Sequence, residues 1–368
     1  MSLKRIGVLT GGGDAPGLNS AIKAVTWKAA DLGIEVVGIY DGWRGLLDGS
    51  SDEVWPLDVE LTRFWDGDGG THLGSSRTNP FKSSGDKPDR SDEVLRNLTR
   101  LGIDALIPIG GEDTLGVATK LGKLGVHVVG IPKTIDKDLG ATDYTIGFDT
   151  SLRTCADIID RSRTPAGSHH WVQFVEVMGR HAGHLALWSG LAGGAFITLI
   201  PELQFDVDRV AALLNERMER GKKDRRYPRY AVVVVAEGAL PKDGHEFNVE
   251  DQLDAFGHKR LGGIGAWLAD EVKKRVKCDT RSVALGHPQR GGPPSATDKI
   301  MGWLFGCSAV EACVKGAWGM MVSADGIAPA CTIRLVPLES ATKELQLVDV
   351  ARHYDVNRYS SSRSLLEG

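Results

Sequence analysis

The sequence has few cysteines, and they are scattered. Its 368 residues contain five, at Cys155, Cys278, Cys307, Cys313 and Cys331, and no two of them form a Cys-x-x-Cys pair. An odd and scattered set argues against a disulfide framework and favours reduced thiols in a cytoplasmic protein.

Long apolar runs and a strong charge excess are also missing. No run of about 18 apolar residues occurs, so we expect no membrane span. The chain enters an apolar, strand-like run almost at once, and we therefore expect no signal peptide. The net charge of -4 and a pI of about 6.2 argue against bulk electrostatic attraction to nucleic acid or to an anionic membrane. No internal repeat of roughly 20–50 residues is present, which excludes a solenoid.

Glycine, in contrast, is abundant, and short apolar runs alternate with helical patterns. The 46 glycines gather at the ends of apolar runs, as in loops that approach a ligand closely. The alternation predicts an α/β fold of doubly wound, mainly parallel sheets. The expected strands are Arg5–Thr10, Ile34–Tyr40, Ala105–Gly110, His127–Pro132, Val172–Met178, Phe196–Pro201, Tyr230–Glu237 and Ser282–Gly286. Their near-continuous apolar character predicts burial on both faces.

The helical patterns fall between these strands. The expected helices are Leu18–Asp31, Ser91–Leu101, Asp113–Gly122, Ser151–Ser162, Val207–Arg220, Gly262–Lys277 and Ala296–Lys315. So many strands exceed one small sheet, and we expect two lobes with a cleft between them. The first boundary is expected near residues 147–150, with the helix around residues 298–315 returning to the first lobe.

One polar stretch, Pro132 to Asp138, follows an apolar run that predicts a buried strand. It therefore belongs at a strand's carboxyl end, where open α/β sheets bind ligands. Of Asp136 and Asp138, one can accept a proton while the other orients it or meets a metal. Lys133 can meet a phosphate as a point charge. The alternative is a polar surface loop without chemistry.

Two glycine-rich stretches follow other expected strands. Residues 10–17 join a strand to a helix and can present backbone N–H groups to an anion. They lack the Gly-Lys-Ser/Thr of a Walker A loop, and Pro16 stands where a dinucleotide fingerprint has its third glycine. Residues 110–114 place Glu112 and Asp113 where a helix begins, which suits Mg²⁺ bridging to a phosphate. A tight turn in the first case and helix capping in the second are the structural alternatives.

Basic and acidic side chains end further strands. Residues 176–183 and 286–292 combine glycines with arginines and histidines, and Glu237 and Arg281 lie at or near strand ends. Arginine forks suit phosphate oxygens. The recurrence of such groups at the carboxyl ends of five expected strands points to one anion-binding site.

Together these stretches resemble the phosphofructokinase family across roughly residues 4–320. The motifs Gly-Gly-Asp-Ala-Pro-Gly, Pro-x-Thr-Ile-Asp-x-Asp, Thr-Asp-Tyr-Thr-Ile-Gly-Phe, Glu-Val-Met-Gly-Arg and Gly-His-x-Gln-Arg-Gly-Gly stand in the family's order. The resemblance implies reversible, Mg²⁺-dependent phosphorylation of the 1-hydroxyl of fructose 6-phosphate, in glycolysis or gluconeogenesis. It also implies a homo-oligomer, a dimer or tetramer, that completes its sugar site across a subunit boundary.

The resemblance assigns lobes and residue roles. Residues 1–147 with about 289–339 would form the phosphoryl-donor lobe, 148–288 the sugar-phosphate lobe, and 340–368 a carboxyl-terminal extension. By motif, Asp136 is the base, Asp138 supports it, and Glu112 takes the metal position, where the family usually has aspartate. Thr134 matches a contact to the reacting end of the sugar phosphate. Gly12 matches a contact to the phosphoryl donor, and Arg77 a contact to the transferring group. The sugar-phosphate contacts match Met178, Gly179, Arg180, Glu237, His287 and Arg290, with Arg281 given by the neighbouring subunit.

Two positions bear on the phosphoryl donor. ATP-using members resemble Gly-Gly-Asp-Gly-Ser and Pro-Gly-Thr-Ile-Asp, whereas this chain has Asp113 and Lys133 in place of the two glycines. That pair resembles the pyrophosphate-dependent members. An Asp side chain occupies space that a nucleotide's α-phosphate and ribose need, while Lys133 adds positive charge for compact pyrophosphate. Because catalysis of phosphoryl transfer is mostly positioning and electrostatics, such a change can alter donor choice.

The chain departs from the family at other positions. Trp171 stands where a second cross-subunit arginine is expected, so a different phosphosugar stays open. Lys23 and Trp27 replace two arginines of the bacterial effector site, although Arg163 is kept, and we expect nucleotide control there to be lost. The alternatives are an ATP-dependent 6-phosphofructokinase, a related phosphosugar kinase, a relative of the NAD and lipid kinases, and a non-enzymatic phosphosugar-binding subunit.

Overall fold

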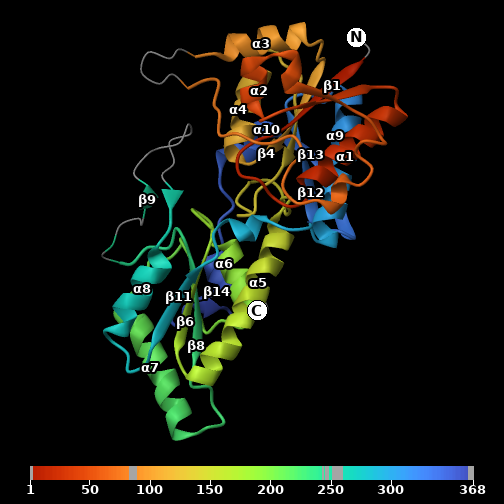
Figure 1. The fold of residues 1–368 in the computed structure, drawn as a ribbon. Helices are drawn as coiled ribbons and strands as arrows, with labels where there is room; N and C mark the ends of the chain where they lie inside the picture. The colour runs from red at the N-terminus through yellow and green to blue at the C-terminus, as the bar shows by residue number, and fades with distance from the viewer. Residues whose placement is uncertain (1–2, 83–88, 243, 245–247, 251–259, 364–368) are drawn as a thin grey trace.

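The computed structural model describes residues 3–82, 89–242, 244, 248–250 and 260–363 (Figure 1). Its helices are α1 Leu18–Asp31, α2 Trp43–Asp48, α3 Ser91–Arg100, α4 Glu112–Lys123, α5 Phe148–His169, α6 His184–Ala192, α7 Val207–Lys223, α8 Ile264–Lys273, α9 Ala296–Val314, α10 Leu338–Lys343 and α11 Val350–His353. Short 3-10 turns occur at Ser51–Glu53, Trp65–Gly67 and His287–Arg290. Its strands are β1 Arg5–Thr10, β2 Glu35–Ile39, β3 Val54–Leu57, β4 Ala105–Gly110, β5 Val129–Pro132, β6 Val172–Val177, β7 Ile197–Leu199, β8 Ala231–Ala236, β9 Asn248–Glu250, β10 Arg260–Leu261, β11 Thr280–Ala284, β12 Met320–Ile327, β13 Ala330–Pro337, β14 Tyr354–Asp355 and β15 Ser360–Ser361.

The first lobe, at the top of Figure 1, is built on a sheet with the strand order β13-β12-β5-β4-β1-β2-β3. Strands β12, β5, β4, β1 and β2 are parallel, and β3 and β13 join the two edges antiparallel. Because side chains alternate across a strand, Ile6 and Val8 pack toward α1 and α9, while Leu9 packs toward α2 and α4. Helices therefore cover both faces.

The second lobe, at the bottom of Figure 1, is built on a sheet with the order β11-β6-β8-β7, and all of its pairs are parallel. The all-apolar run of β8, Ala231–Ala236, is buried throughout. Helices α5 and α6 pack onto this sheet, as does α8. The predicted fold class, two mainly parallel α/β lobes, is confirmed.

Several predicted boundaries differ from the structure. The last strand of the second sheet runs from Thr280 to Ala284, so it starts two residues before its predicted start and ends two residues before its predicted end. It starts early because Thr280 already pairs with Val172 of β6, and it ends early because Gly286 (φ 54°) belongs to the turn that follows. Four of its five residues are exposed, so the predicted burial on both faces is wrong for β11. Helix α5 continues beyond the predicted end at Ser162 and includes Pro165, with the Thr164 hydroxyl donating to the Arg161 carbonyl at 3.2 Å. The hairpin β12–β13 and helix α6 were not predicted.

The chain after β13 returns from the first lobe to the second. Helix α10 packs against α4, and residues 344–349 then lead down to α11 and β14, as the dark blue trace in Figure 1 shows. The Tyr354 hydroxyl donates to the Thr198 carbonyl at 2.6 Å, and Thr198 N donates to the Tyr359 carbonyl at 2.6 Å. Residues 364–368 of the predicted extension lie outside the described residues. Within the described part of the chain, no helix has the length and apolar character needed to cross a bilayer.

Candidate active site

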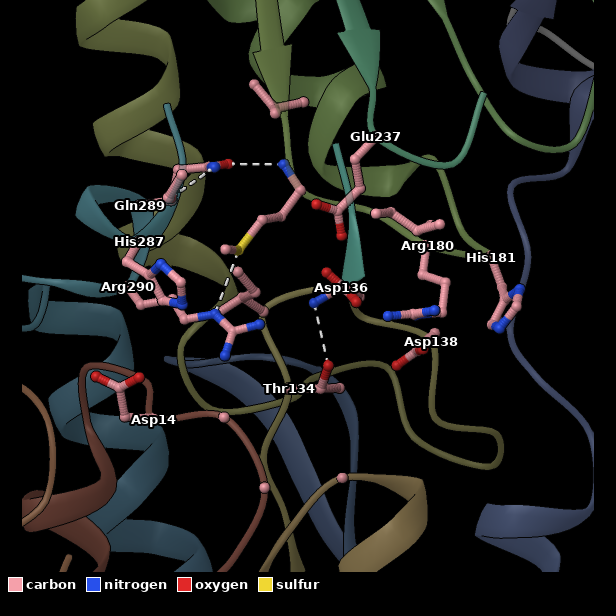
Figure 2. Close-up of a pocket in the computed structure, with 18 of the residues that line it drawn as sticks. Asp14, Thr134, Asp136, Asp138, Arg180, His181, Glu237, His287, Gln289 and Arg290 are labelled. Carbon is pink, nitrogen blue, oxygen red and sulfur yellow. Dashed lines mark hydrogen bonds between the residues drawn. The ribbon is translucent and has the colours of Figure 1, made fainter. Parts of the chain in front are cut away.

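A cavity of about 790 Å³ lies between the lobes, where the carboxyl ends of strands from both sheets face one another (Figure 2). Loops after β1, β4 and β5 line it from the first lobe, and segments after β6, β8 and β11 line it from the second. Parallel strands place their carboxyl ends at one sheet edge, which is why residues far apart in sequence meet here. The predicted residues that line the cavity are Gly12, Arg77, Glu112, Asp113, Lys133, Thr134, Asp136, Asp138, Met178, Arg180, Glu237, His287 and Arg290.

The loop after β1 is hydrogen-bonded to the residues that precede Arg77. Gly12 N donates to the Ser76 carbonyl at 3.2 Å, and the Ser75 hydroxyl donates to the Gly12 carbonyl at 2.5 Å. Gly12 itself has a φ of 78°, in the left-handed region that favours glycine. These contacts bring the predicted donor loop and Arg77 to the same wall.

Lys133 lines the cavity and binds the backbone of that loop. Its ammonium donates to the carbonyl of Gly11 at 3.1 Å and to that of Gly13 at 2.5 Å. Burial, with a smaller effect from the nearby Arg290 guanidinium, lowers the pKa of Lys133 to about 7. A buried cation with three N–H donors, two of them used by the loop, has one left to direct at a ligand.

Asp136 follows Lys133 by three residues and has an unused acceptor. Asp136 N donates to the Thr134 hydroxyl at 3.1 Å, which orients the short turn that carries both residues. Its side-chain Oδ1 is buried and has no hydrogen-bond partner among the described residues. Burial raises the pKa of Asp136, against the opposing charges of Arg290 and Arg180. The arrangement suits a general base, because a raised pKa strengthens a carboxylate as a proton acceptor.

Two further carboxyl groups near Asp136 have strongly raised pKa values. Burial, and next the charge of Asp136, raise the pKa of Asp138 to about 7. Burial, and next the charge of Asp136, also raise the pKa of Glu237 to about 7. Carboxyl groups with perturbed pKa values gather at functional sites more often than elsewhere.

The wall from the second lobe is formed by Met178, Arg180 and Arg290. The Arg290 side chain donates from Nε to the Met178 sulfur at 3.2 Å, which directs its guanidinium into the cavity beside Asp136 (Figure 2). Arg180 approaches Asp136 from the opposite side in the same view. Two arginines converging on one carboxylate make a pocket for an anionic substrate group.

Two of the predicted residues are not among those that line the cavity. Gly179 has a φ of 135°, and a Cβ there would lie 2.8 Å from the Ala182 carbonyl, so it shapes the turn after β6. Arg281 lies on the edge strand β11 with its side chain 53% exposed and its guanidinium 5.7 Å from the centre of the Trp171 ring. Within one chain, Arg281 is therefore separate from the other predicted substrate contacts.

The carboxylates that line the cavity suit Mg²⁺, provided that oxygens of the substrate supply further ligands. No group of three or more His, Cys, Asp or Glu side chains forms a metal cluster within the described residues. Glu112 and Asp138 line the same cavity, and the charge of Glu112 contributes to raising the pKa of Asp138. Mg²⁺ commonly uses one or two carboxylates with substrate phosphate oxygens and water.

Some residues that shape the site were not predicted. Gln289 is fully buried; its Oε1 accepts from Met178 N at 3.0 Å, and its Nε2 donates to the Gly286 carbonyl at 2.9 Å. Glu176 accepts from Gly263 N at 3.1 Å and from Gly265 N at 2.8 Å, which fixes the start of α8 at the cavity. Gln289 lies inside the 286–292 motif, so the sequence predicted that it lies near the site but did not indicate its role.

Comparison with known proteins agrees with this geometry. The family model described as Phosphofructokinase matches residues 5–313. The chain belongs to the phosphofructokinase family.

Relatives within this phosphofructokinase family differ in the donor they are named for. The chain is 50% identical over 354 residues to the pyrophosphate–fructose 6-phosphate 1-phosphotransferase of Amycolatopsis mediterranei, covering 95% of this chain and 98% of the relative. It is 43% identical over 356 residues to the ATP-dependent 6-phosphofructokinase of Corynebacterium efficiens, covering 96% and 97%. The solved pyrophosphate-dependent phosphofructokinase of Nitrosospira multiformis superimposes with a TM-score of 0.82 at 21% identity, over 98% of this chain and 89% of that one, which shows the shared fold.

Proposed function

We propose that this phosphofructokinase transfers a phosphoryl group from pyrophosphate to the 1-hydroxyl of fructose 6-phosphate. The buried, unpartnered Oδ1 of Asp136 carries the proposal, because it faces a cavity with a phosphate-type loop on one side and two arginines on the other. In the reaction the hydroxyl oxygen bonds to one phosphorus of pyrophosphate, the bond from that phosphorus to the bridging oxygen breaks, and the proton passes to Asp136. The products are fructose 1,6-bisphosphate and phosphate.

The chain's own residues divide the work. Gly12, Lys133 and Arg77 hold the donor, with Lys133 fixed by the Gly11 and Gly13 carbonyls. Thr134 and Asp138 orient the base, and Arg180 and Arg290, with Glu237 and His287, hold the sugar phosphate. Positioning and charge stabilisation of this kind supply most of the rate enhancement in phosphoryl transfer.

Pyrophosphate is preferred over ATP because of the two residues that face the donor. Asp113 stands in the first turn of α4 and lines the cavity, where its carboxylate adds volume and negative charge against a nucleotide's additional phosphate and ribose. Lys133 offers a buried cation to a small, highly charged anion. ATP is the second candidate, since a relative named as ATP-dependent is 43% identical.

Glu112 is the residue proposed to hold Mg²⁺, together with oxygens of the bound donor. When bound, Mg²⁺ neutralises charge that develops on the transferring phosphoryl group. Glu112 is one methylene longer than the aspartate that the family usually has at this position, and it still lines the cavity.

A homo-oligomer would give Arg281 a place in the reaction. Arg281 is exposed at the edge of the second lobe, next to the half-buried Trp171, and neither lines the cavity of its own chain. We propose that Arg281 enters the sugar-phosphate pocket of a neighbouring subunit, which explains why an arginine stands at this exposed position. Purified Arg281→Ala protein should keep its oligomeric state in size-exclusion chromatography while the KM for fructose 6-phosphate rises.

The test of the activity is product formation by the purified chain. Incubation with fructose 6-phosphate, pyrophosphate and Mg²⁺ should yield fructose 1,6-bisphosphate and phosphate in equal amounts, resolved by ³¹P NMR. Phosphate release without a bisphosphate product, or no turnover in either direction, would contradict the proposal.

A further inference from the structure

A segment beyond the residues matched by the family model crosses between the two lobes beside the proposed base. Residues 341–348, which we name the carboxyl-terminal strap, run from α10 in the first lobe toward α11 in the second (Figure 1). In Figure 2 this part of the chain passes to the right of His181 and Asp138. It makes hydrogen bonds with segments of both lobes.

On the first lobe the strap holds the segment that follows Asp136. Gln346 N donates to the Asp138 carbonyl at 2.8 Å, and Gly140 N donates to the Ala341 carbonyl at 3.2 Å. Leu139 and Leu345 form an antiparallel bridge between these contacts. The Gln346 amide faces the Thr142 and Leu139 carbonyl oxygens at 2.9 and 3.2 Å, and its nitrogen donates to both in the orientation that satisfies them.

On the second lobe the strap is bound at the start of α6. His184 Nε2 donates to the Gln346 carbonyl at 3.0 Å, and Val348 N donates to Glu202 Oε1 at 2.9 Å. The same Glu202 oxygen accepts from Gly183 N at 2.8 Å. His184 is buried, and burial lowers its pKa to about 4, so the ring is neutral near pH 7 and its single N–H is directed at the strap.

The segment held by the strap has an unfavourable backbone. Lys137, between the two aspartates, has a φ of 56°, and Ala141 has a φ of 60°. Neither is glycine, and residues with side chains rarely adopt this left-handed conformation. Such conformations persist only where the surrounding structure holds them. Strap bonds at Asp138, Leu139 and Gly140 lie between these two residues, and the bond at Thr142 directly follows Ala141.

We propose that Gln346 is a positioning residue, and that the strap holds Asp136 and Asp138 in catalytic geometry and fixes their lobe against the Arg180 wall. Gln346 bonds the loop through its amide and its backbone N–H, and bonds the second lobe through its carbonyl. It touches no substrate and acts through the loop. The effect on catalysis rests on the proposed function, whereas the effect on loop order does not.

The test compares Gln346→Ala with Leu347→Ala, a control in the same strap at a residue that is 48% exposed. Gln346→Ala should lower kcat by about 10- to 100-fold, the range that a small misplacement of reacting groups produces, while KM for both substrates stays within about twofold. Leu347→Ala should match the wild type. His184→Leu should lower kcat in the same way, and His184→Gln, which keeps an N–H donor, should recover most of it.

A second measurement separates this inference from the activity itself. Hydrogen exchange at residues 137–142 should be faster in Gln346→Ala than in the wild type, with exchange in β1 and β4 unchanged. Adding Ala141→Gly, which relieves the strain at φ 60°, should restore part of the lost kcat. Wild-type kcat in Gln346→Ala, or unchanged exchange at residues 137–142, would overturn the inference. If the wild type has no turnover, the proposed function fails and exchange alone decides the role of the strap.

Discussion

Removing the ammonium of Lys133 should reduce the use of pyrophosphate more than any other property of the enzyme. Lys133→Met keeps much of the side-chain length and the apolar stem but removes the charge and the three N–H donors. In the structure two of those donors bind the Gly11 and Gly13 carbonyls, and the third is available to pyrophosphate. The substitution therefore removes a charge-assisted contact to the donor and loosens the loop that presents it.

The size of the effect follows from the energy of such a contact. Hydrogen bonds to charged groups contribute about 1.5–3 kcal/mol, and about 1.4 kcal/mol is tenfold in rate. We therefore expect kcat/KM for pyrophosphate to fall about 10- to 150-fold. The KM for fructose 6-phosphate should change little, because Arg180 and Arg290 are untouched.

The assay is the initial rate of fructose 1,6-bisphosphate formation over a series of pyrophosphate concentrations at fixed, saturating fructose 6-phosphate. The matched control is Lys123→Met, the same change of charge at a lysine on α4 whose side chain is 64% exposed and ion-paired to Glu339. It should behave as the wild type. A Lys133→Met protein with kcat/KM within about twofold of the wild type would refute the donor role of Lys133.

Three further predictions follow from the same geometry. Asp136→Asn should lower kcat by about 10²- to 10⁴-fold with fructose 6-phosphate binding retained in calorimetry, since a base is lost but shape is kept; near-normal kcat would exclude Asp136 as the base. The value of kcat/KM for pyrophosphate should fall below about pH 7, because Asp138 and Glu237 take up protons, and should fall above about pH 7, because Lys133 loses its proton. Lys133→Met should remove the fall on the alkaline side. An unchanged alkaline fall in that variant would assign it to another group. Asp298→Ala should lower the free energy of unfolding by at least about 3 kcal/mol in urea titrations, because each buried donor left without an acceptor costs about 1–3 kcal/mol. Asp298 accepts from Gly147 N, Tyr144 Oη and Thr150 N at 2.6–2.8 Å; a loss under about 1 kcal/mol would contradict this.

The part of the site that sequence could predict is the part encoded locally. Asp136 and Lys133 follow an apolar strand within a few residues, so their place at a strand end and their chemistry could be predicted together. The strand β1 and helix α1 were predicted with their observed limits for the same reason.

The unpredicted part depends on contacts distant in sequence. Gln346 meets Asp138 and His184 only because the chain returns across both lobes, and nothing in the polar and apolar pattern near Gln346 indicates this. Helix α5 was predicted to end before Pro165, but the freed Arg161 carbonyl accepts from Thr164 and the helix continues. Strand β11 is exposed at one edge of its sheet whereas β7 is buried at the other, a difference set by what covers each edge and not by the composition of the strands.

The most direct test of the central claim is the ratio of kcat/KM for pyrophosphate to that for ATP, measured on one preparation with fructose 6-phosphate and Mg²⁺. The proposed fit of Asp113 and Lys133 to the donor predicts turnover with pyrophosphate and a kcat/KM for ATP that is at least about tenfold lower, a difference of about 1.4 kcal/mol or more. A kcat/KM for ATP equal to or above that for pyrophosphate would contradict it.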